Sequence, residues 1–375
     1  MNSFALSVVL LGQLLVAAAH DMVGPEQVDV FVAGELGYKE FRIPVLVVTK
    51  SGVLLAVSEA GRSSSDFGDR DLLLRRSADG GRTWSAARML RDEGAKTCGN
   101  PTVIVDRLNG RIHLLSTVDG RHLFYNYSDD EGLDWSQFCE ITDVLESFKS
   151  EFAWNRFATG SGLGVELAGG KDKGRFIMTC WLTKDEKEFR SAVLYSDDRG
   201  KTWKAGGLSD PNFNTNECYV YERADGTLCL NMRGGGNHPQ ASREPYRIVA
   251  TSGDGGFTWS KSSYDQNLIG PQCHACVRRY SWPEAGRSRI LFSNPANTKH
   301  RVNMTVRVSY DEGKTWPAAK QIFAGPSAYS CLERLPNGDI GLLYERGARH
   351  RYQKMTFARF SLGWLTDGED KPSGR

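Results

Sequence analysis

Short apolar runs separated by turn residues dominate the chain, in the manner of β-strands. Val45–Val48 and Val53–Val57, for example, flank one predicted turn. Turn signals between further apolar runs are Asn109-Gly110, Asp225-Gly226 and Asn337-Gly338. Such pairs favour tight hairpins because glycine accepts a positive φ. No long segment has the 3.6-residue period of an amphipathic helix, so the pattern predicts an all-β protein built of hairpins.

One eight-residue motif recurs five times along the chain. Its cleanest copy reads Ser-Ala-Asp-Gly-Gly-Arg-Thr-Trp at residues 77–84, and the others start at residues 128, 196, 252 and 309. Successive copies therefore begin 51, 68, 56 and 57 residues apart. The Asp can accept hydrogen bonds from turn amides, the Gly can take a positive φ, and the Trp can pack between sheets. The copy at 128–135 is degenerate, because Asp134 replaces the usual Thr.

This spacing suits the blades of a β-propeller and is too long for a solenoid repeat. Residues 20–375 divided among six blades give about 59 residues for each, which matches the repeat. The sequence thus predicts an all-β, six-bladed β-propeller of four-stranded antiparallel blades over residues 20–375. Strands from both chain ends should close the last blade. The motifs are expected to be structural turns, because the Glu at the twelfth position of a calcium loop is missing.

The N-terminus has the character of a signal peptide. An apolar run from Phe4 to Ala19 ends in three alanines, which a signal peptidase accepts, and 16 residues are few for a membrane span. We expect residues 1–19 to be removed and the mature chain to be exported, to the periplasm or outside the cell, with no membrane span; a retained anchor is the alternative. In an exported chain some of the eight cysteines could form disulfides, in pairs that the sequence does not specify.

Overall charge gives no case for a nucleic-acid partner, because 47 basic and 45 acidic residues leave a formal charge of only +2. The tetrapeptide Phe41-Arg42-Ile43-Pro44 together with the five motifs resembles the bacterial and animal exo-sialidases. The resemblance covers essentially the whole mature chain. It implies a monomeric glycoside hydrolase, without metal or cofactor, that removes terminal α-linked sialic acids from oligosaccharides, glycoproteins and glycolipids. It also implies retention of configuration through a tyrosyl-enzyme intermediate.

In this family three arginines bind the substrate carboxylate. A guanidinium suits that task because it is planar, permanently charged and able to bind a carboxylate bidentately. Matching motifs identify them as Arg42, Arg233 and Arg301, with Arg307 as an alternative to the third. Glu345, in Leu-Leu-Tyr-Glu-Arg, matches the glutamate that holds the first arginine.

The family's nucleophile is a tyrosine, and sialidases are a known exception to the two-carboxylate rule of glycosidases. A neutral phenol avoids the charge repulsion that a carboxylate nucleophile would meet at a carbon bearing a carboxylate, provided that a base removes its proton. The motif match identifies Tyr329 as nucleophile and Glu217 as base. Tyr344 and Glu222 are the respective alternatives.

The acid/base residue of relatives is an aspartate on a polar loop, nine residues before the first of two paired arginines. That register selects Asp66, with Asp69 and Asp71 as alternatives. Arg62 and Asn100 match positions that line the pocket near the 4-hydroxyl group in relatives.

The glycine-rich segment 158–164 resembles a pocket wall of the family. It departs from the pattern at Ser161 and Leu163, which leaves the fit of the acyl and glycerol groups open. Three other functions remain alternatives: a trans-sialidase, an intramolecular variant that releases an anhydro sugar, and a non-catalytic propeller that binds sialoglycans.

Overall fold

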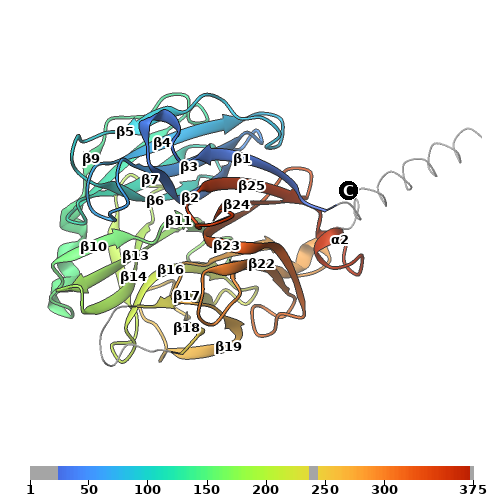
Figure 1. Cartoon of the computed structure of the whole chain (residues 1–375). Helices are drawn as coiled ribbons and strands as arrows, with labels where there is room; N and C mark the ends of the chain where they lie inside the picture. Colours follow the sequence, from blue (N-terminus) through green and yellow to red (C-terminus); the bar gives the residue numbers. More distant parts are fainter. Residues whose placement is uncertain (1–23, 236–243, 372–375) are drawn as a thin grey trace, which may run out of the picture.

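The computed structural model describes residues 24–235 and 244–371. The signal peptide expected at residues 1–19 lies outside the described residues. The described chain forms 25 β-strands in five hydrogen-bonded sheets (Figure 1). Its helical segments are short: the 3₁₀ helices η1 (Glu35–Gly37), η2 (Thr142–Ser150) and η3 (Pro283–Ala285), and the α-helix α2 (Leu362–Leu365). The all-β prediction is therefore confirmed.

Four of the sheets have four or five strands each. The first contains β2 (Glu40–Val48), β3 (Leu54–Gly61), β4 (Arg70–Ser77) and β5 (Arg88–Arg91). The second contains β6 (Cys98–Val105), β7 (Ile112–Val118), β8 (His122–Ser128), β9 (Cys139–Glu140) and β11 (Gly162–Leu163). The third contains β10 (Arg156–Thr159), β12 (Val165–Glu166), β13 (Phe176–Lys184), β14 (Glu188–Ser196) and β15 (Lys204–Leu208). The fourth contains β16 (Thr215–Glu222), β17 (Leu228–Gly234), β18 (Tyr246–Ser252) and β19 (Ser263–Ile269).

The fifth sheet has seven strands and joins the two ends of the chain. Its strands, in spatial order, are β1 (Glu26–Val32), β25 (Lys354–Phe360), β24 (Ile340–Arg346), β23 (Ala318–Arg334), β22 (Val302–Ser309), β21 (Arg289–Pro295) and β20 (Cys276–Ser281). The long strand β23 pairs with β22 through its first half and with β24 through its second half. The antiparallel pairing of β1 with β25 confirms that strands from both chain ends come together.

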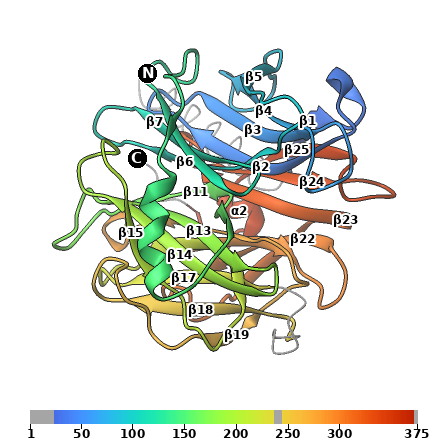
Figure 2. The ribbon, with the colours of Figure 1, turned by 90° about the vertical axis from the view of Figure 1, so that its left-hand side faces the viewer.

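The sheets are arranged like the blades of a propeller (Figures 1 and 2). One strand of each region contacts the next around a closed ring: β2 contacts β6, β6 contacts β13, β13 contacts β16, β16 contacts β20, β20 contacts β23, and β23 contacts β2. Among these inner strands, β2 carries buried residues at eight of its nine positions and β16 at all eight. Buried strands of this kind read as continuous apolar runs, which is the pattern seen in the sequence.

The repeated motif forms a self-contained turn in each copy. In the first copy the Asp79 carboxylate accepts hydrogen bonds from the Thr83 backbone N–H at 3.0 Å and from its hydroxyl at 2.6 Å. The Ser77 hydroxyl donates to the same carboxylate at 2.8 Å and accepts the Gly81 N–H at 2.9 Å. Gly81 has a φ of 90°, and a side chain there would overlap the Phe357 ring. The Trp84 ring packs edge-on against that same phenylalanine.

Two further observations concern the exported-protein hypothesis. Within residues 24–235 and 244–371, no helix combines the length and apolarity needed to cross a bilayer. All eight cysteines are unpaired in the structure, and seven of them are buried.

Candidate active site

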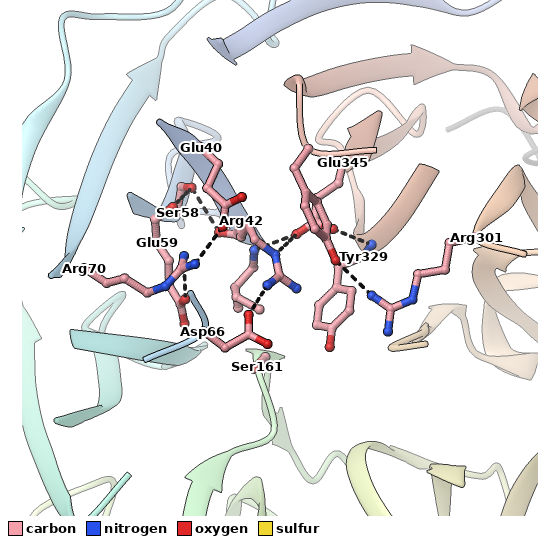
Figure 3. Close-up of polar contacts among 12 residues, drawn as sticks. Glu40, Arg42, Ser58, Glu59, Asp66, Arg70, Ser161, Arg301, Tyr329 and Glu345 are labelled. Carbon is pink, nitrogen blue, oxygen red and sulfur yellow. Dashed lines mark hydrogen bonds and ion pairs between the residues drawn. The ribbon is translucent and has the colours of Figure 1, made fainter. Parts of the chain in front are cut away.

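Three arginines from separate elements meet in one cavity of about 450 Å³. Arg42 lies in β2, Arg233 lies in β17, and Arg301 directly precedes β22. Figure 3 shows Arg42 and Arg301 on either side of Tyr329, and their guanidinium carbons lie 5.5 and 5.7 Å from the centre of its ring. The sequence thus selected three arginines that share a cavity, and Arg307 does not line it.

A β-bulge sets the position of Arg42. The pairing of β2 with β3 shifts between Arg42 and Val45, and Ile43 has a φ of 56°. Pro44 fits the bulge because it has no N–H that would need a partner. The freed N–H of Ile43 donates to the Glu345 carboxylate at 2.9 Å instead of to the neighbouring strand.

Glu345 connects β2, which carries Arg42, with β23, which carries Tyr329. Its fully buried carboxylate accepts the N–H of Ile43 and, at 3.0 Å, the N–H of Tyr329. The Arg42 Nε lies 3.8 Å away, so the contact with the arginine is an ion pair rather than a close hydrogen bond. Burial raises the pKa of Glu345, while Arg42 and the two backbone N–H groups act in the opposite direction. The residue expected to hold Arg42 therefore also fixes the backbone of Tyr329.

Tyr329, which lines the cavity, is in direct contact with the buried Glu217. The phenol donates a short hydrogen bond to one carboxylate oxygen of Glu217. Arg233 donates to the other oxygen at 2.7 Å and to the phenol oxygen at 3.0 Å. Glu217 and Arg233 come together because β16 and β17 form a hairpin whose register shifts between Thr215 and Cys218.

The electrostatics of this trio keep the phenol protonated and the carboxylate charged. Burial, and then the charge of Glu217, raise the pKa of Tyr329 well above its usual value. Burial alone would raise the pKa of Glu217 as well, but the Arg233 charge and the hydrogen bonds from Tyr329 and Arg233 bring it down to about 2. A charged carboxylate holding a neutral phenol is the resting arrangement of a base beside its nucleophile.

Asp66 lies on the exposed loop between β3 and β4. Its side chain is 72% exposed and pairs with Arg42, as Figure 3 shows. The loop is tied down by Arg70, which donates two hydrogen bonds to the Ser65 carbonyl, at 2.9 and 2.6 Å. Arg70 is itself almost fully buried and pairs with Glu40 at 2.6 Å. Sequence reasoning missed Arg70, because its strand position resembles that of any other buried arginine.

The alternatives to these residues lie elsewhere. Asp69 and Asp71 both pair with Arg62, at 3.0 Å each, instead of lining the cavity. The Tyr344 hydroxyl donates to Gln27 at 3.0 Å. Glu222 accepts the backbone N–H groups of the segment 168–169.

Arg62 and Asn100 do not line the cavity either. Arg62 stacks over the Tyr38 ring, 4.5 Å from its centre, in addition to its two aspartate partners. The Asn100 side chain accepts the Ser161 hydroxyl at 2.9 Å. Ser161, one of the two departures in the glycine-rich segment, takes a φ of 62° and is buried. Neither of the two predicted sugar contacts is therefore among the residues that line the cavity.

His274, which was not predicted, packs against the ring of Tyr329. Its ring stacks on Tyr329 with centroids 4.8 Å apart and planes 17° apart. The Nε2 atom lies 2.9 Å from the Ser161 carbonyl, and burial lowers the pKa of His274 to about 4. The residue is therefore neutral at ordinary pH and presents a flat surface that fixes the phenol ring. Its sequence setting, between two cysteines, carries no signal for this role.

Four further residues line the rim of the cavity together with the predicted ones: Lys299, His300, Arg351 and Tyr352. Lys299 and Arg351 add two positive charges. Tyr352 accepts a hydrogen bond from Arg301 at 3.0 Å and lies under the Arg42 guanidinium, 4.1 Å from its ring centre. These rim residues stand in loops, where no repeat or periodicity marks them.

Comparison with known proteins identifies the family of the chain. Residues 44–342 match the model of the BNR repeat-like domain family. A protein of Micromonospora viridifaciens named sialidase is 34% identical over 90% of this chain, which spans 54% of that protein's length. An anhydrosialidase of Macrobdella decora is 31% identical over 65% of this chain and 33% of its own length. The chain thus spans about half of the length of the Micromonospora viridifaciens protein, and the match covers about a third of the Macrobdella decora protein.

Among solved structures, one titled Hadza microbial sialidase Hz136 superposes with a TM-score of 0.79. It is 28% identical and the match covers 90% of this chain and 69% of that one.

Proposed function

The chain belongs to the BNR repeat-like domain family, and from this premise we propose that it is an exo-α-sialidase. It hydrolyses terminal α-linked sialic acids of oligosaccharides, glycoproteins and glycolipids with retention of configuration. The observation that carries the proposal is the direct contact of Glu217 with Tyr329, which lines a cavity that three arginines share. A buried phenol bonded to a carboxylate is a nucleophile with its base, and three guanidinium groups suit a sugar that carries a carboxylate.

Arg42, Arg233 and Arg301 together are called the arginine clamp, and substrate binding changes the partners of its members. Without substrate, Arg42 pairs with Asp66 and Arg233 pairs with Glu217. The carboxylate of the sugar competes for both arginines, so it releases Asp66, which takes up a proton from solvent and can then reach the glycosidic oxygen. The sugar carboxylate also offsets part of the Arg233 charge that holds down the pKa of Glu217. The substrate itself thereby turns Glu217 into a stronger base.

The reaction then proceeds in two displacements. In the first, Tyr329 gives its proton to Glu217 and attacks the anomeric carbon, while Asp66 protonates the departing oxygen. In the second, Asp66 takes a proton from water, the water displaces the tyrosyl oxygen, and Glu217 returns the proton to Tyr329. Two inversions leave the configuration of the sugar unchanged. Stacking on His274 and the backbone bond to Glu345 hold the phenol in place for both steps.

Two further parts of the proposal concern architecture and location. We count the seven-stranded sheet as two blades that share β23, which together with the other four sheets makes six; the closed ring of inner strands supports this count. We also propose that the chain is exported after removal of residues 1–19 and acts as a monomer.

An intramolecular variant is the second candidate, favoured by the similarity to the Macrobdella decora anhydrosialidase. In such an enzyme a hydroxyl of the bound sugar, rather than water, displaces the tyrosine. Transfer to another sugar is a third outcome of the same intermediate. Product analysis with and without excess lactose separates the three, because free sialic acid, an anhydro sugar and sialyllactose have different masses.

The direct test is hydrolysis of a fluorogenic sialoside followed by NMR of the first product. We expect fluorophore release together with initial formation of the α-anomer of free sialic acid. Absence of cleavage would leave a binding propeller, and an initial β-anomer would exclude the tyrosyl intermediate.

A further inference from the structure

The rim of the active-site cavity holds two cations that the sialidase reaction does not use. Lys299 is exposed on the loop between β21 and β22, and Arg351 is half-buried on the loop between β24 and β25. Within residues 24–235 and 244–371, neither side chain has an ion pair with a carboxylate. The Arg351 guanidinium lies 4.8 Å from the Tyr352 ring centre, and its buried Nε finds no hydrogen-bond partner in that part of the chain.

Charge in the cavity is not balanced by a single substrate carboxylate. Arg42 faces Asp66 and Glu345, and Arg233 faces Glu217. Arg301 has no carboxylate partner among the described residues. We therefore expect the sugar carboxylate to bind Arg301 together with Arg42 and Arg233. Lys299 and Arg351 then remain without an anion. A charged wall of this kind favours ligands with a second negative group.

The position of these cations indicates which part of the substrate they face. Lys299 stands two residues before Arg301, and Arg351 directly precedes Tyr352, whose hydroxyl contacts Arg301. Both therefore lie beside the clamp and not at the buried contact of Tyr329 with Glu217. In a sialoside the carboxylate and the glycosidic oxygen are attached to the same carbon. The sugar next to the sialic acid is therefore attached within a few bonds of the carboxylate that the arginines hold, in the cavity that Lys299 and Arg351 also line.

We infer that Lys299 and Arg351 form a subsite for an oxyanion on the sugar to which the sialic acid is attached. The chemistry fits the carboxylate of an internal sialic acid, as in an α2,8-linked chain, or a sulfate ester. This inference rests on the proposed sialidase function and specifies its substrates. Partly exposed ion pairs are individually weak, so the subsite ranks substrates instead of deciding whether catalysis occurs.

The test compares kcat/KM for three substrates: 3′-sialyllactose, α2,8-disialyllactose and a sulfated sialyllactose. The native protein should favour at least one of the two anionic aglycones over the neutral one, and the preference should shrink as salt is added. In the double variant Lys299→Gln/Arg351→Gln the ratio of anionic to neutral kcat/KM should fall about tenfold, the sum of two partly exposed pairs. Lys261→Gln, an exposed lysine outside the cavity, serves as the matched control and should leave the ratio unchanged.

The outcomes are distinct. Preference for the disialyl substrate alone identifies a carboxylate ligand, and preference for the sulfated one alone identifies a sulfate. Equal kcat/KM values for all three substrates in the native protein, or a ratio that survives the double substitution, would overturn the subsite. Failure to cleave 3′-sialyllactose at all would instead contradict the proposed function.

Discussion

The turns of the repeated motif and the cavity are built on opposite plans. In each turn an aspartate finds its partners within four residues, as Asp79 does with Thr83, and the arrangement is repeated five times. In the cavity, Tyr329 meets Glu217, which is 112 positions away in the sequence, and neither has a second copy. The turns are near the surface and locally satisfied, whereas Tyr329 and Glu217 are buried and depend on several strands. Damage to a turn should therefore affect stability, and damage to the cavity should affect chemistry.

The largest expected effect is that of Tyr329→Phe. This change removes one oxygen from the cavity floor, and we expect kcat to fall about 1,000-fold or more because no other group can attack the anomeric carbon. Binding of a non-hydrolysable sialic acid analogue, measured by calorimetry, should change little because the arginines remain. Tyr344→Phe is the matched control, since this buried tyrosine bonds Gln27 away from the cavity. Full activity of the Tyr329 variant would show that another residue is the nucleophile.

Sequence reasoning succeeded where local chemistry fixes the outcome. The hairpin signals at Asn337-Gly338 and its counterparts, and the motif turns, were predictable because their partners lie a few residues away. Arg42, Glu217 and Tyr329 were found only because their motifs resemble a known family. Their meeting depends on the closure of the whole ring, which no local pattern encodes.

The residues that were missed have no local signature. His274 acts through the face of its ring against Tyr329, and Arg70 acts by holding the Ser65 carbonyl beside Asp66. Either side chain would suit an ordinary core position. The assignment of Arg62 to the pocket came from motif alignment alone, and the structure shows this side chain held by Asp69 and Asp71. Packing and charge pairing in the folded chain decide such positions, and one sequence does not display them.

A smaller effect is expected from Arg42→Lys. An ammonium keeps the charge but cannot reproduce a bidentate contact or stack on Tyr352 as the guanidinium does. Weakening one buried charge contact costs about 2–3 kcal/mol, so kcat/KM should fall about 30- to 150-fold, mainly through KM. Steady-state kinetics on a fluorogenic sialoside measure this. The control is Arg307→Lys, which alters a buried arginine bonded to Asn294 and should leave KM unchanged. Equal losses of kcat/KM in both variants would mean that Arg42 has no specific role in binding the substrate carboxylate.

The smallest effect should come from a single turn, in Asp254→Asn. The Asp254 carboxylate accepts the Thr258 N–H at 3.0 Å and its hydroxyl at 2.5 Å, and neutralising it weakens these charge-assisted bonds by about 1 kcal/mol in total. We expect thermal denaturation to show a loss of about 1–2 °C with kcat and KM unchanged. Asp130→Asn, in the degenerate copy where Asp134 offers no hydroxyl, should cost less. A drop in kcat for either variant would break the division between turns and cavity.

The pH dependence of the same variant sharpens the comparison further. Burial opposes the shift, but the hydrogen bonds from Thr258 and Ser252 lower the pKa of Asp254 from 3.8 to about 2. A carboxyl group whose pKa is lower in the folded state stabilises the fold above its unfolded pKa, and this contribution is lost as pH falls through the folded value. The stability difference between native protein and variant should therefore be constant above about pH 5 and fall progressively below it, to a minor part by about pH 2. Denaturant titrations across that range measure it, and a difference that is undiminished at pH 2 would mean that the turn does not depend on the charge of its aspartate.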